Sequence, residues 1–224
     1  QYYMNLIVDA MEPYLKTNGI RYTRNTPGTS LAQAIRESNE GYYDLHLAIH
    51  SNAAPPDLSG KLQGVDVYYY PYSTRGKRAA EIIAKNYKEI YPNPAKVKTV
   101  PTTTLVEITK TNAPAVLVET AYHDNSEDAD WIRNNINNIA ANLVKSLTEY
   151  FGIPFISPPQ PQRNGQVQTQ GGNLNIRSKP DLSASIIAKA PNGAAICVFG
   201  EWQGWYVVEY NDVIGYASKQ YIKI

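Results

Sequence analysis

Residues 45–52 (LHLAIHSN) decide the fold, together with residues 114–119 (PAVLVE). Each stretch is a short apolar run that is typical of a buried strand. Each also carries, at or near its end, a residue that can bind a metal or move a proton: His50 in the first and Glu119 in the second. In open α/β sheets, ligands bind outside the carboxyl ends of the strands. The two runs therefore predict an α/β domain with the site of a metal-dependent hydrolase at that edge.

Helical and strand-like segments alternate around these runs, which predicts a mostly parallel sheet flanked by helices. Apolar residues at helical spacing predict helices over 2–17, 31–37, 76–90 and 128–151, and Asn18-Gly19 is a typical helix stop. Strands are predicted over 20–24, 44–50 and 64–70, besides the one that ends at Glu119. Residues 91–104 are expected to form a long loop, and such loops in compact domains are usually functional or mobile.

The composition changes after residue 151. Residues 152–172 are rich in Pro, Gln, Ser, Gly and Asn, which predicts a semi-extended linker. Three strand-like runs follow, LNIRSKP (174–180), GWYVV (204–208) and GYAS (215–218), separated by turns. Their order and spacing resemble the bacterial SH3-like domains that are appended to cell-wall enzymes. We therefore expect a first domain over 1–151, a linker over 152–172 and a small all-β SH3-like barrel over 173–224.

Composition excludes some classes of partner. The 224 residues carry a net charge of +1, which gives no reason to expect nucleic acid or an acidic membrane. No run approaches the roughly 18 apolar residues of a membrane span, and no signal peptide is visible. A single cysteine, Cys197, rules out an intramolecular disulfide framework.

Three segments occur in one order: DLHLAIHSN (44–52), GVDVYY (64–69) and APAVLVETAYHDNSED (113–128). They resemble the zinc-dependent N-acetylmuramoyl-L-alanine amidases, which cut the amide between the sugar and the stem peptide of peptidoglycan. The resemblance implies one catalytic Zn2+ ion, with His50 as a ligand and Glu119 acting in catalysis. The family's other two ligands, a His and a Glu, would lie upstream of or near Gln1. We therefore expect the first strand of the domain to be missing from these residues.

His46 lies four residues before His50, on the same face of the predicted strand. Four residues of strand span roughly 13 Å at about 3.3 Å each. Both ring nitrogens would have to lie within about 2.1 Å of a shared metal. His46 is therefore rejected as a second ligand, and we expect it to be a packed histidine that orients another group by a hydrogen bond.

His123 follows Glu119 in a predicted loop, where the chain can fold back to the site. The family usually carries an apolar residue at this position, so the resemblance implies nothing for it. Three roles stay open: a metal ligand, a contact to substrate, or a cap of the following helix together with Asp124 and Asn125.

Glu119 has two interpretations. It pairs with a neighbouring Lys or Arg, or the buried sheet desolvates it and raises its pKa towards that of a general base. In the second case Glu119 takes a proton from metal-bound water and delivers it to the departing alanine amine. Asn52 follows the metal-binding histidine closely, so it either donates to substrate or forms a local turn bond.

Six aromatic residues cluster in the last domain: Trp202, Trp205, Tyr206, Tyr210, Tyr216 and Tyr221. Strand alternation predicts that roughly half of them are buried. The others are expected to form a groove for cell-wall peptide or glycan, and Trp205 and Tyr216 are the residues assigned to substrate binding. Such a tether raises the local concentration of substrate without new catalytic contacts.

Two classes of function remain open. The first is a zinc-dependent peptidoglycan amidase of a bacterium or a phage endolysin, acting outside the cell or in its wall, with any export signal outside this chain. The second is a wall-binding or scaffolding protein that keeps the fold and has lost ligands. A third reading is another peptidoglycan hydrolase, such as a peptidase. The retained His50 and Glu119 favour the first.

Overall fold

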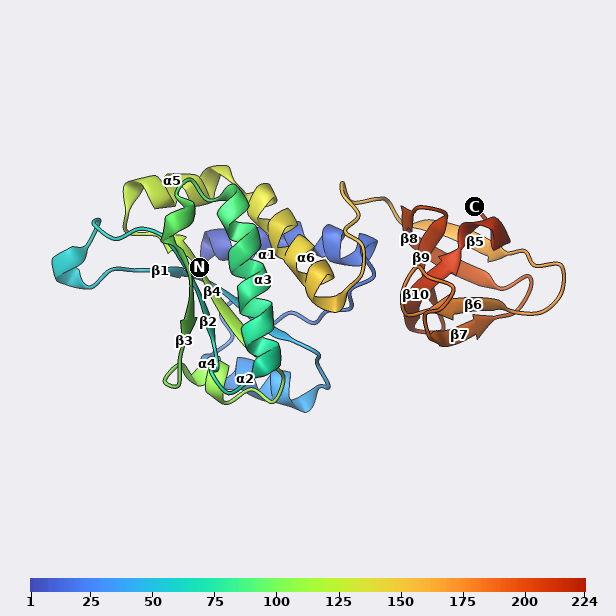
Figure 1. The fold of residues 1–224 in the computed structure, drawn as a ribbon, viewed down its shortest axis with the longest axis horizontal. Coiled ribbons are helices and arrows are strands. Elements are labelled where there is room, and N and C mark those ends of the chain that lie inside the picture. The colour runs from blue at the N-terminus through green and yellow to red at the C-terminus, as the bar shows by residue number, and fades with distance from the viewer. The chain divides into compact units, whose positions relative to one another are not determined.

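The computed structural model describes residues 1–224, which divide into two compact units. Unit 1 comprises Gln1–Met11 and Thr23–Tyr150, and unit 2 comprises Glu12–Tyr22 and Phe151–Ile224. The elements of the first 151 residues are α1 (Tyr2–Thr17), α2 (Leu31–Glu40), β1 (His46–Asn52), η1 (Pro56–Leu58), β2 (Val65–Tyr69), α3 (Thr74–Ile90), η2 (Pro94–Lys96), β3 (Val97–Pro101), α4 (Val106–Thr109), β4 (Ala115–Tyr122), α5 (Ser126–Asn134) and α6 (Ile136–Phe151) (Figure 1).

The sheet of unit 1 has four strands in the order β1-β4-β2-β3. β1 pairs with β4 in parallel, and so does β2 with β3, whereas β2 and β4 are antiparallel. The sheet is therefore mixed. Two of its three strand pairings are parallel, as the alternation of helices and strands predicts, and the third is antiparallel. The antiparallel pairing brings the beginning of β2 to the edge where β1 and β4 end.

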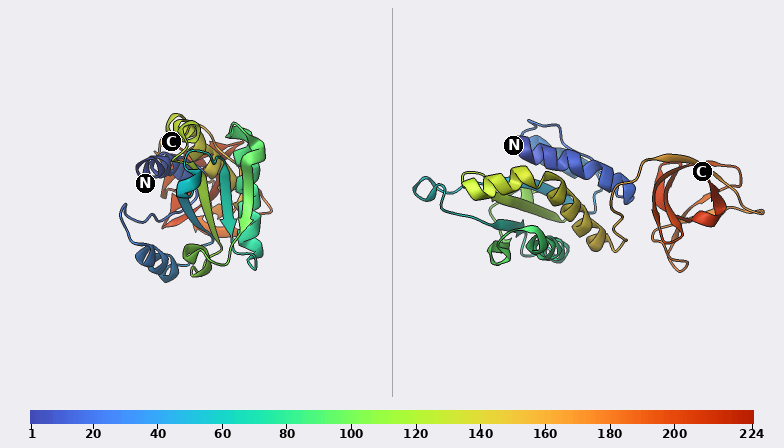
Figure 2. Two further views of the ribbon diagram at one scale, coloured as in Figure 1. Left: turned by 90° about the vertical axis from the view of Figure 1, so that its left-hand side faces the viewer. Right: turned by 90° about the horizontal axis from the view of Figure 1, so that it is seen from above.

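Helix α3 lies along one face of this sheet (Figures 1 and 2). Its apolar positions at helical spacing, among them Ala80, Ile83 and Tyr87, are fully or almost fully buried. Tyr87 Oη lies 3.4 Å from Thr120 Oγ1 of β4, so the residues of β4 that alternate with Glu119 face α3. The side chains of His50 and Glu119 consequently belong to the opposite face.

Several elements differ from the prediction. Residues 20–24 form no strand, and the loop expected over 91–104 contains the strand β3. The helix expected over 128–151 is two helices, α5 and α6, because Asn135 ends the first of them. The predicted helices over 2–17, 31–37 and 76–90 are present with similar bounds, and Gly19 adopts a φ of 70° after the first. None of the helices combines the length and the apolarity needed to cross a bilayer.

Unit 2 contains a seven-stranded antiparallel sheet in the order β11-β5-β8-β9-β10-β6-β7. Its elements are β5 (Arg163–Val167), β6 (Leu174–Arg177), β7 (Ile186–Ala190), β8 (Ala195–Trp202), β9 (Trp205–Tyr210), β10 (Val213–Ser218), η3 (Lys219–Tyr221) and β11 (Ile222–Lys223). Buried residues such as Val167, Ile176 and Val208 form its core. The strand β5 lies inside the segment predicted to be a linker and pairs with β8 and β11, so that segment is not wholly extended linker.

The end of α1 packs as part of unit 2. The fully buried Asn18 side chain accepts a hydrogen bond from the Ile156 N–H (2.6 Å) and donates to the carbonyl oxygens of Tyr14 (2.8 Å) and Ile156 (3.1 Å). Gly200 of β8 is so close to Thr17 that an added Cβ would lie 2.4 Å from its carbonyl oxygen. Residues 12–22 are therefore built into the small domain.

Candidate active site

The predicted pair of functional residues lies side by side at one edge of the sheet. In the parallel pairing of β1 and β4, His50 is the direct partner of Glu119. Both strands bury apolar residues just before these positions, including Ala48 and Leu117, which anchor the backbone of the two functional residues. The sheet therefore brings together the two residues that the sequence singles out.

The Glu119 carboxylate has one oxygen without a hydrogen-bond partner. Its Oε2 atom is buried and has no hydrogen-bond partner, which is costly for a carboxylate. Burial raises the pKa of Glu119 above its ordinary value of 4.5, and the nearby Asp66 raises it further, while His50 opposes the shift. A carboxyl group with a raised pKa and a free oxygen is suited to accept and return a proton.

Asp66 of β2 is a neighbour of Glu119 that the sequence did not single out. The antiparallel register pairs the two residues directly, so their side chains share one face of the sheet. Asn52 Nδ2 lies 3.5 Å from Asp66 Oδ2, and burial raises the pKa of Asp66. In a fully parallel sheet, Asp66 at the beginning of β2 would lie at the opposite end of the strands from Glu119. The predicted parallel topology therefore gave no reason to place Asp66 in the site.

Glu107 was also missed, and it contacts both histidines of β1. Its Oε1 lies 3.1 Å from His46 Nε2 and its Oε2 lies 3.4 Å from His50 Nε2. It belongs to the short helix α4, whose Ile108 is buried against Ala48 and so fixes the direction of the carboxylate. The sequence signal that could have identified Glu107 is its place in a long predicted loop, shortly before the strand that carries Glu119.

His46 links Glu107 to Ser38 of helix α2. His46 Nδ1 lies 2.9 Å from Ser38 Oγ of α2, so His46 is the packed, orienting histidine that was expected. Burial alone would raise the pKa of Glu107, but its hydrogen bonds with His46 and His50 hold this pKa at about 2. The hydrogen bond with Glu107 in turn raises the pKa of His50. His46 and Glu107 are therefore largely shielded from solvent, whereas His50 is the most exposed of the three interacting side chains.

His123 lies beside β1 but is not brought into a metal cluster. Its Nδ1 is 3.1 Å from Ser51 Oγ, and its backbone N–H donates to Asn52 O (2.9 Å). The exposed ring also lines a small hollow of about 190 Å³ together with Gln1 and Tyr3. Asn52 accepts from the N–H of the next residue through its own Oδ1 (2.9 Å), the local turn bond that was one of its two expected roles.

The loop between β1 and β2 projects from unit 1 beside this edge (Figure 1). Asp124 ties the loop to the end of β4 by accepting from the N–H groups of Ala54 (3.1 Å) and Gly60 (3.0 Å) and from Ser59 Oγ (3.3 Å). These bonds hold the pKa of Asp124 below its usual range, with the Gly60 N–H the largest cause. The loops that follow β1 and β4 are therefore hydrogen-bonded to each other at this edge of the sheet.

The described residues only partly fit a catalytic zinc. Such a site needs three protein ligands and an open position, but residues 1–224 contain no group of three His, Cys, Asp or Glu side chains that could hold a metal ion. His50 fits as one ligand through Nδ1, because Glu107 contacts its Nε2. The unpartnered Oε2 of Glu119 beside it also suits a site that binds a further group.

In unit 2, the two aromatic residues assigned to substrate binding differ in exposure. Tyr216 is 3% exposed, and its hydroxyl donates to Asn18 O at 3.5 Å. This burial leaves little of the Tyr216 ring for a contact with the wall, and strand alternation does not tell which face of a strand is covered. Trp205 is partly buried and packs on the apolar cluster that includes Ile156 and Tyr216. Its role as a wall contact stays a prediction.

The chain thus combines an α/β domain, with a histidine and carboxylates at one sheet edge, and a small antiparallel β domain. The chain belongs to the N-acetylmuramoyl-L-alanine amidase family, which it matches over residues 3–149, more than half of its length. Residues 172–223 match the bacterial SH3 domain. The chain is therefore an amidase of peptidoglycan with an appended SH3 domain.

Solved structures agree with this assignment of the fold. The N-acetylmuramoyl-L-alanine amidase AmiC2 of Nostoc punctiforme is 18% identical, with a TM-score of 0.58 over 67% of this chain and 83% of that one. The catalytic domain of CwlV, an N-acetylmuramoyl-L-alanine amidase from Bacillus (Paenibacillus) polymyxa var. colistinus, is 23% identical, with a TM-score of 0.56 over 66% of this chain and 83% of that one. The catalytic domain of the CD27L endolysin targeting Clostridia difficile is 21% identical, with a TM-score of 0.54 over 66% and 82%. A comparison with the curated proteins gives no match.

Proposed function

We propose that this amidase is zinc-dependent and cleaves the bond between N-acetylmuramic acid and the L-alanine of the stem peptide. Residues 1–151 carry the reaction, and residues 173–224 hold the enzyme on the wall, where it acts outside the cell. The observation that carries the proposal is the pairing of Glu119, with its buried and unpartnered Oε2, beside His50 at the edge of the sheet.

Glu119 is the group that moves the proton. Its raised pKa makes it a stronger base, which takes a proton from the attacking water and returns that proton to the leaving alanine amine. Asp66 lies opposite and raises the pKa of Glu119, so it favours the protonated form that the second step needs. When bound, zinc supplies polarisation of the scissile carbonyl and acidification of water.

Glu107 and His46 are positioning residues in this proposal. The Glu107 carboxylate holds the ring of His50, and His46 with Ser38 holds Glu107. Such partners orient a metal-binding imidazole and set which nitrogen is free. His50 is thus expected to offer Nδ1.

A second candidate function has an observation in its favour. Because residues 1–224 bring together no three metal-binding side chains, a protein that binds the wall without cleaving it is also consistent with the fold. The two candidates differ in whether new chemical groups appear when the protein meets its substrate.

The deciding experiment incubates the protein with purified peptidoglycan, with and without a chelator, and identifies released products by mass spectrometry. Release of stem peptides with a free N-terminal alanine that stops with chelator and returns with zinc supports the amidase proposal. Cleavage within the stem peptide would instead support a peptidase. Sedimentation with the wall and no new amino groups would support the wall-binding candidate.

A further inference from the structure

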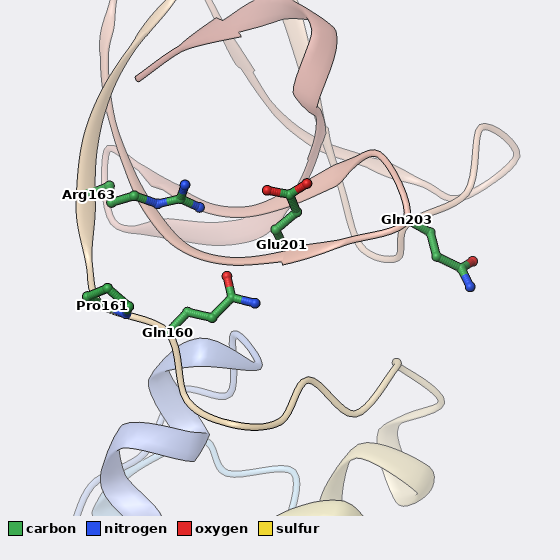
Figure 3. A pocket seen from close by; sticks show the side chains of 5 residues that line it. All are labelled: Gln160, Pro161, Arg163, Glu201 and Gln203. Carbon is green, nitrogen blue, oxygen red and sulfur yellow. The ribbon is translucent and has the colours of Figure 1, made fainter.

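Unit 2 contains an open hollow of about 470 Å³ that none of the predicted site residues lines. Gln160, Pro161 and Arg163 form one wall, from the segment that leads into β5 (Figure 3). Glu201 at the end of β8 and Gln203 in the following turn form the other. The side chains of Gln160 and Arg163 extend towards Glu201 across the hollow (Figure 3).

The segment of Gln160 is held firmly in place. Its N–H donates to Thr17 Oγ1 (2.8 Å), and the same hydroxyl donates to Gln160 O (3.3 Å). Arg163 is itself paired in the β5–β8 ladder, opposite Val198. The wall is therefore preformed, which lowers the entropic cost of ligand binding.

The charges of the hollow leave one cation without an acidic partner. Lys219 Nζ forms an ion pair with Glu201 Oε1 at 2.5 Å, so these two charges offset each other. The Arg163 guanidinium lies 5.2 Å from the centre of the Tyr206 ring and makes no ion pair. Lys219 approaches the same ring at 5.6 Å. Stacking on the buried ring holds Arg163 in position while its N–H groups remain available.

We propose that this hollow binds a carboxylate of a peptidoglycan stem peptide through Arg163, with the amides of Gln160 and Gln203 pairing to the peptide chain. The proposal rests on the wall-binding role proposed above and names the chemical group that unit 2 recognises. An Arg guanidinium binds a carboxylate by two parallel hydrogen bonds. A side-chain amide offers both a donor and an acceptor, which matches the needs of a peptide group.

The charge balance favours a carboxylate over a phosphate-bearing polymer. One unpaired guanidinium matches a single negative charge, and Lys219, which approaches the same ring, is already paired with Glu201. The partly exposed position of the hollow also suits the end of a peptide, which enters from solvent. Inorganic phosphate is therefore expected to compete poorly with acetate for this place.

The test titrates the full chain with soluble stem peptides by calorimetry, using peptides with free carboxylates and the same peptides amidated. Wild type is compared with Arg163→Gln, with Arg163→Lys, which keeps the charge without the fork, and with Lys189→Gln. The last removes one positive charge from an exposed position of β7. Arg163→Gln is expected to weaken binding roughly tenfold or more, Arg163→Lys less, and Lys189→Gln not at all. Amidation should weaken the binding of wild type to the same extent.

Equal affinities of wild type and Arg163→Gln would overturn the proposal, as would indifference to amidation or stronger competition by phosphate than by acetate. Thermal unfolding of each variant checks that unit 2 remains folded. Sedimentation with purified walls separates this inference from the role on which it rests. If wild type and Arg163→Gln sediment equally, wall binding stands and the hollow is not its site. If wild type does not sediment, the wall-binding role itself fails.

Discussion

Glu107 Oε2 lies 3.4 Å from Nε2 of His50, although Glu107 belongs to a four-residue helix and His50 to the edge strand of the sheet. The side chain of Glu107 is only 12% exposed, and its other oxygen is taken up by His46. A carboxylate in this place accepts from Nε2–H and leaves Nδ1 without a proton. The pair therefore leaves Nδ1 as the nitrogen of His50 with a free lone pair.

Glu107→Gln should reduce kcat by about 10- to 100-fold with little change in KM. The amide cannot accept from both histidines as a carboxylate does, so the ring of His50 loses its fixed orientation. The measurement is the rate of amine release from purified walls, together with the zinc content of the protein, which should also fall. Glu81→Gln, on the exposed surface of α3, is the matched control. An unchanged rate and zinc content in Glu107→Gln would refute the positioning role.

Glu119→Gln should lower kcat by about 100-fold or more, since general acid–base groups contribute roughly that much. The folded state loses no hydrogen bond at Oε2, because that atom has none. The melting temperature of the variant should therefore not fall below that of wild type. Amine release and thermal unfolding measure the two effects separately. Activity that survives the substitution would assign proton transfer to another group, with Asp66 the first to examine.

The strongest sequence signals concerned elements whose apolar residues are buried. β1 and β4 were expected from their apolar runs, and α3 from its helical spacing. β3 and β5 were not, because Val97–Pro101 and Arg163–Val167 are largely exposed or polar strands that form by pairing with a neighbour. Apolar periodicity reports burial by the side chains, and it carries little information on strands defined mainly by backbone pairing.

The same limit applies to the site. His50 and Glu119 could be predicted because they sit on apolar strands, whereas Asp66 depends on the antiparallel pairing of β2 with β4. Glu107 depends on the burial of Ile108, a tertiary contact. For Tyr216, strand alternation gives two faces without saying which one is covered, and the structure buries its side.

Glu149 should make unit 1 more stable at neutral than at acidic pH. Its hydrogen bond with Lys85 (2.6 Å), aided by one from Asn86 (3.3 Å), lowers the pKa of Glu149. A lowered pKa gives stability that is present above the unfolded value, near 4.5, and is lost as the pH falls through the folded value. Glu149→Gln should thus cost about 0.5–1 kcal/mol at pH 7 and much less near pH 3. Urea unfolding at both pH values measures this difference, and an equal cost at both would contradict it.

Asn18→Ala should destabilise unit 2 by about 2–4 kcal/mol, because it leaves the buried N–H and C=O of Ile156 without partners. Hydrogen exchange at the Ile156 amide gives a local measurement, since this N–H donates to Asn18 Oδ1 at 2.6 Å. Protection of that amide should fall sharply in Asn18→Ala. It should be partly kept in Asn18→Asp, which retains an acceptor and loses the donor to the carbonyl oxygens of Tyr14 and Ile156. Asn164→Ala, at an exposed position of β5, is the control. Unchanged protection in Asn18→Ala would mean that residues 12–22 are not built into the small domain.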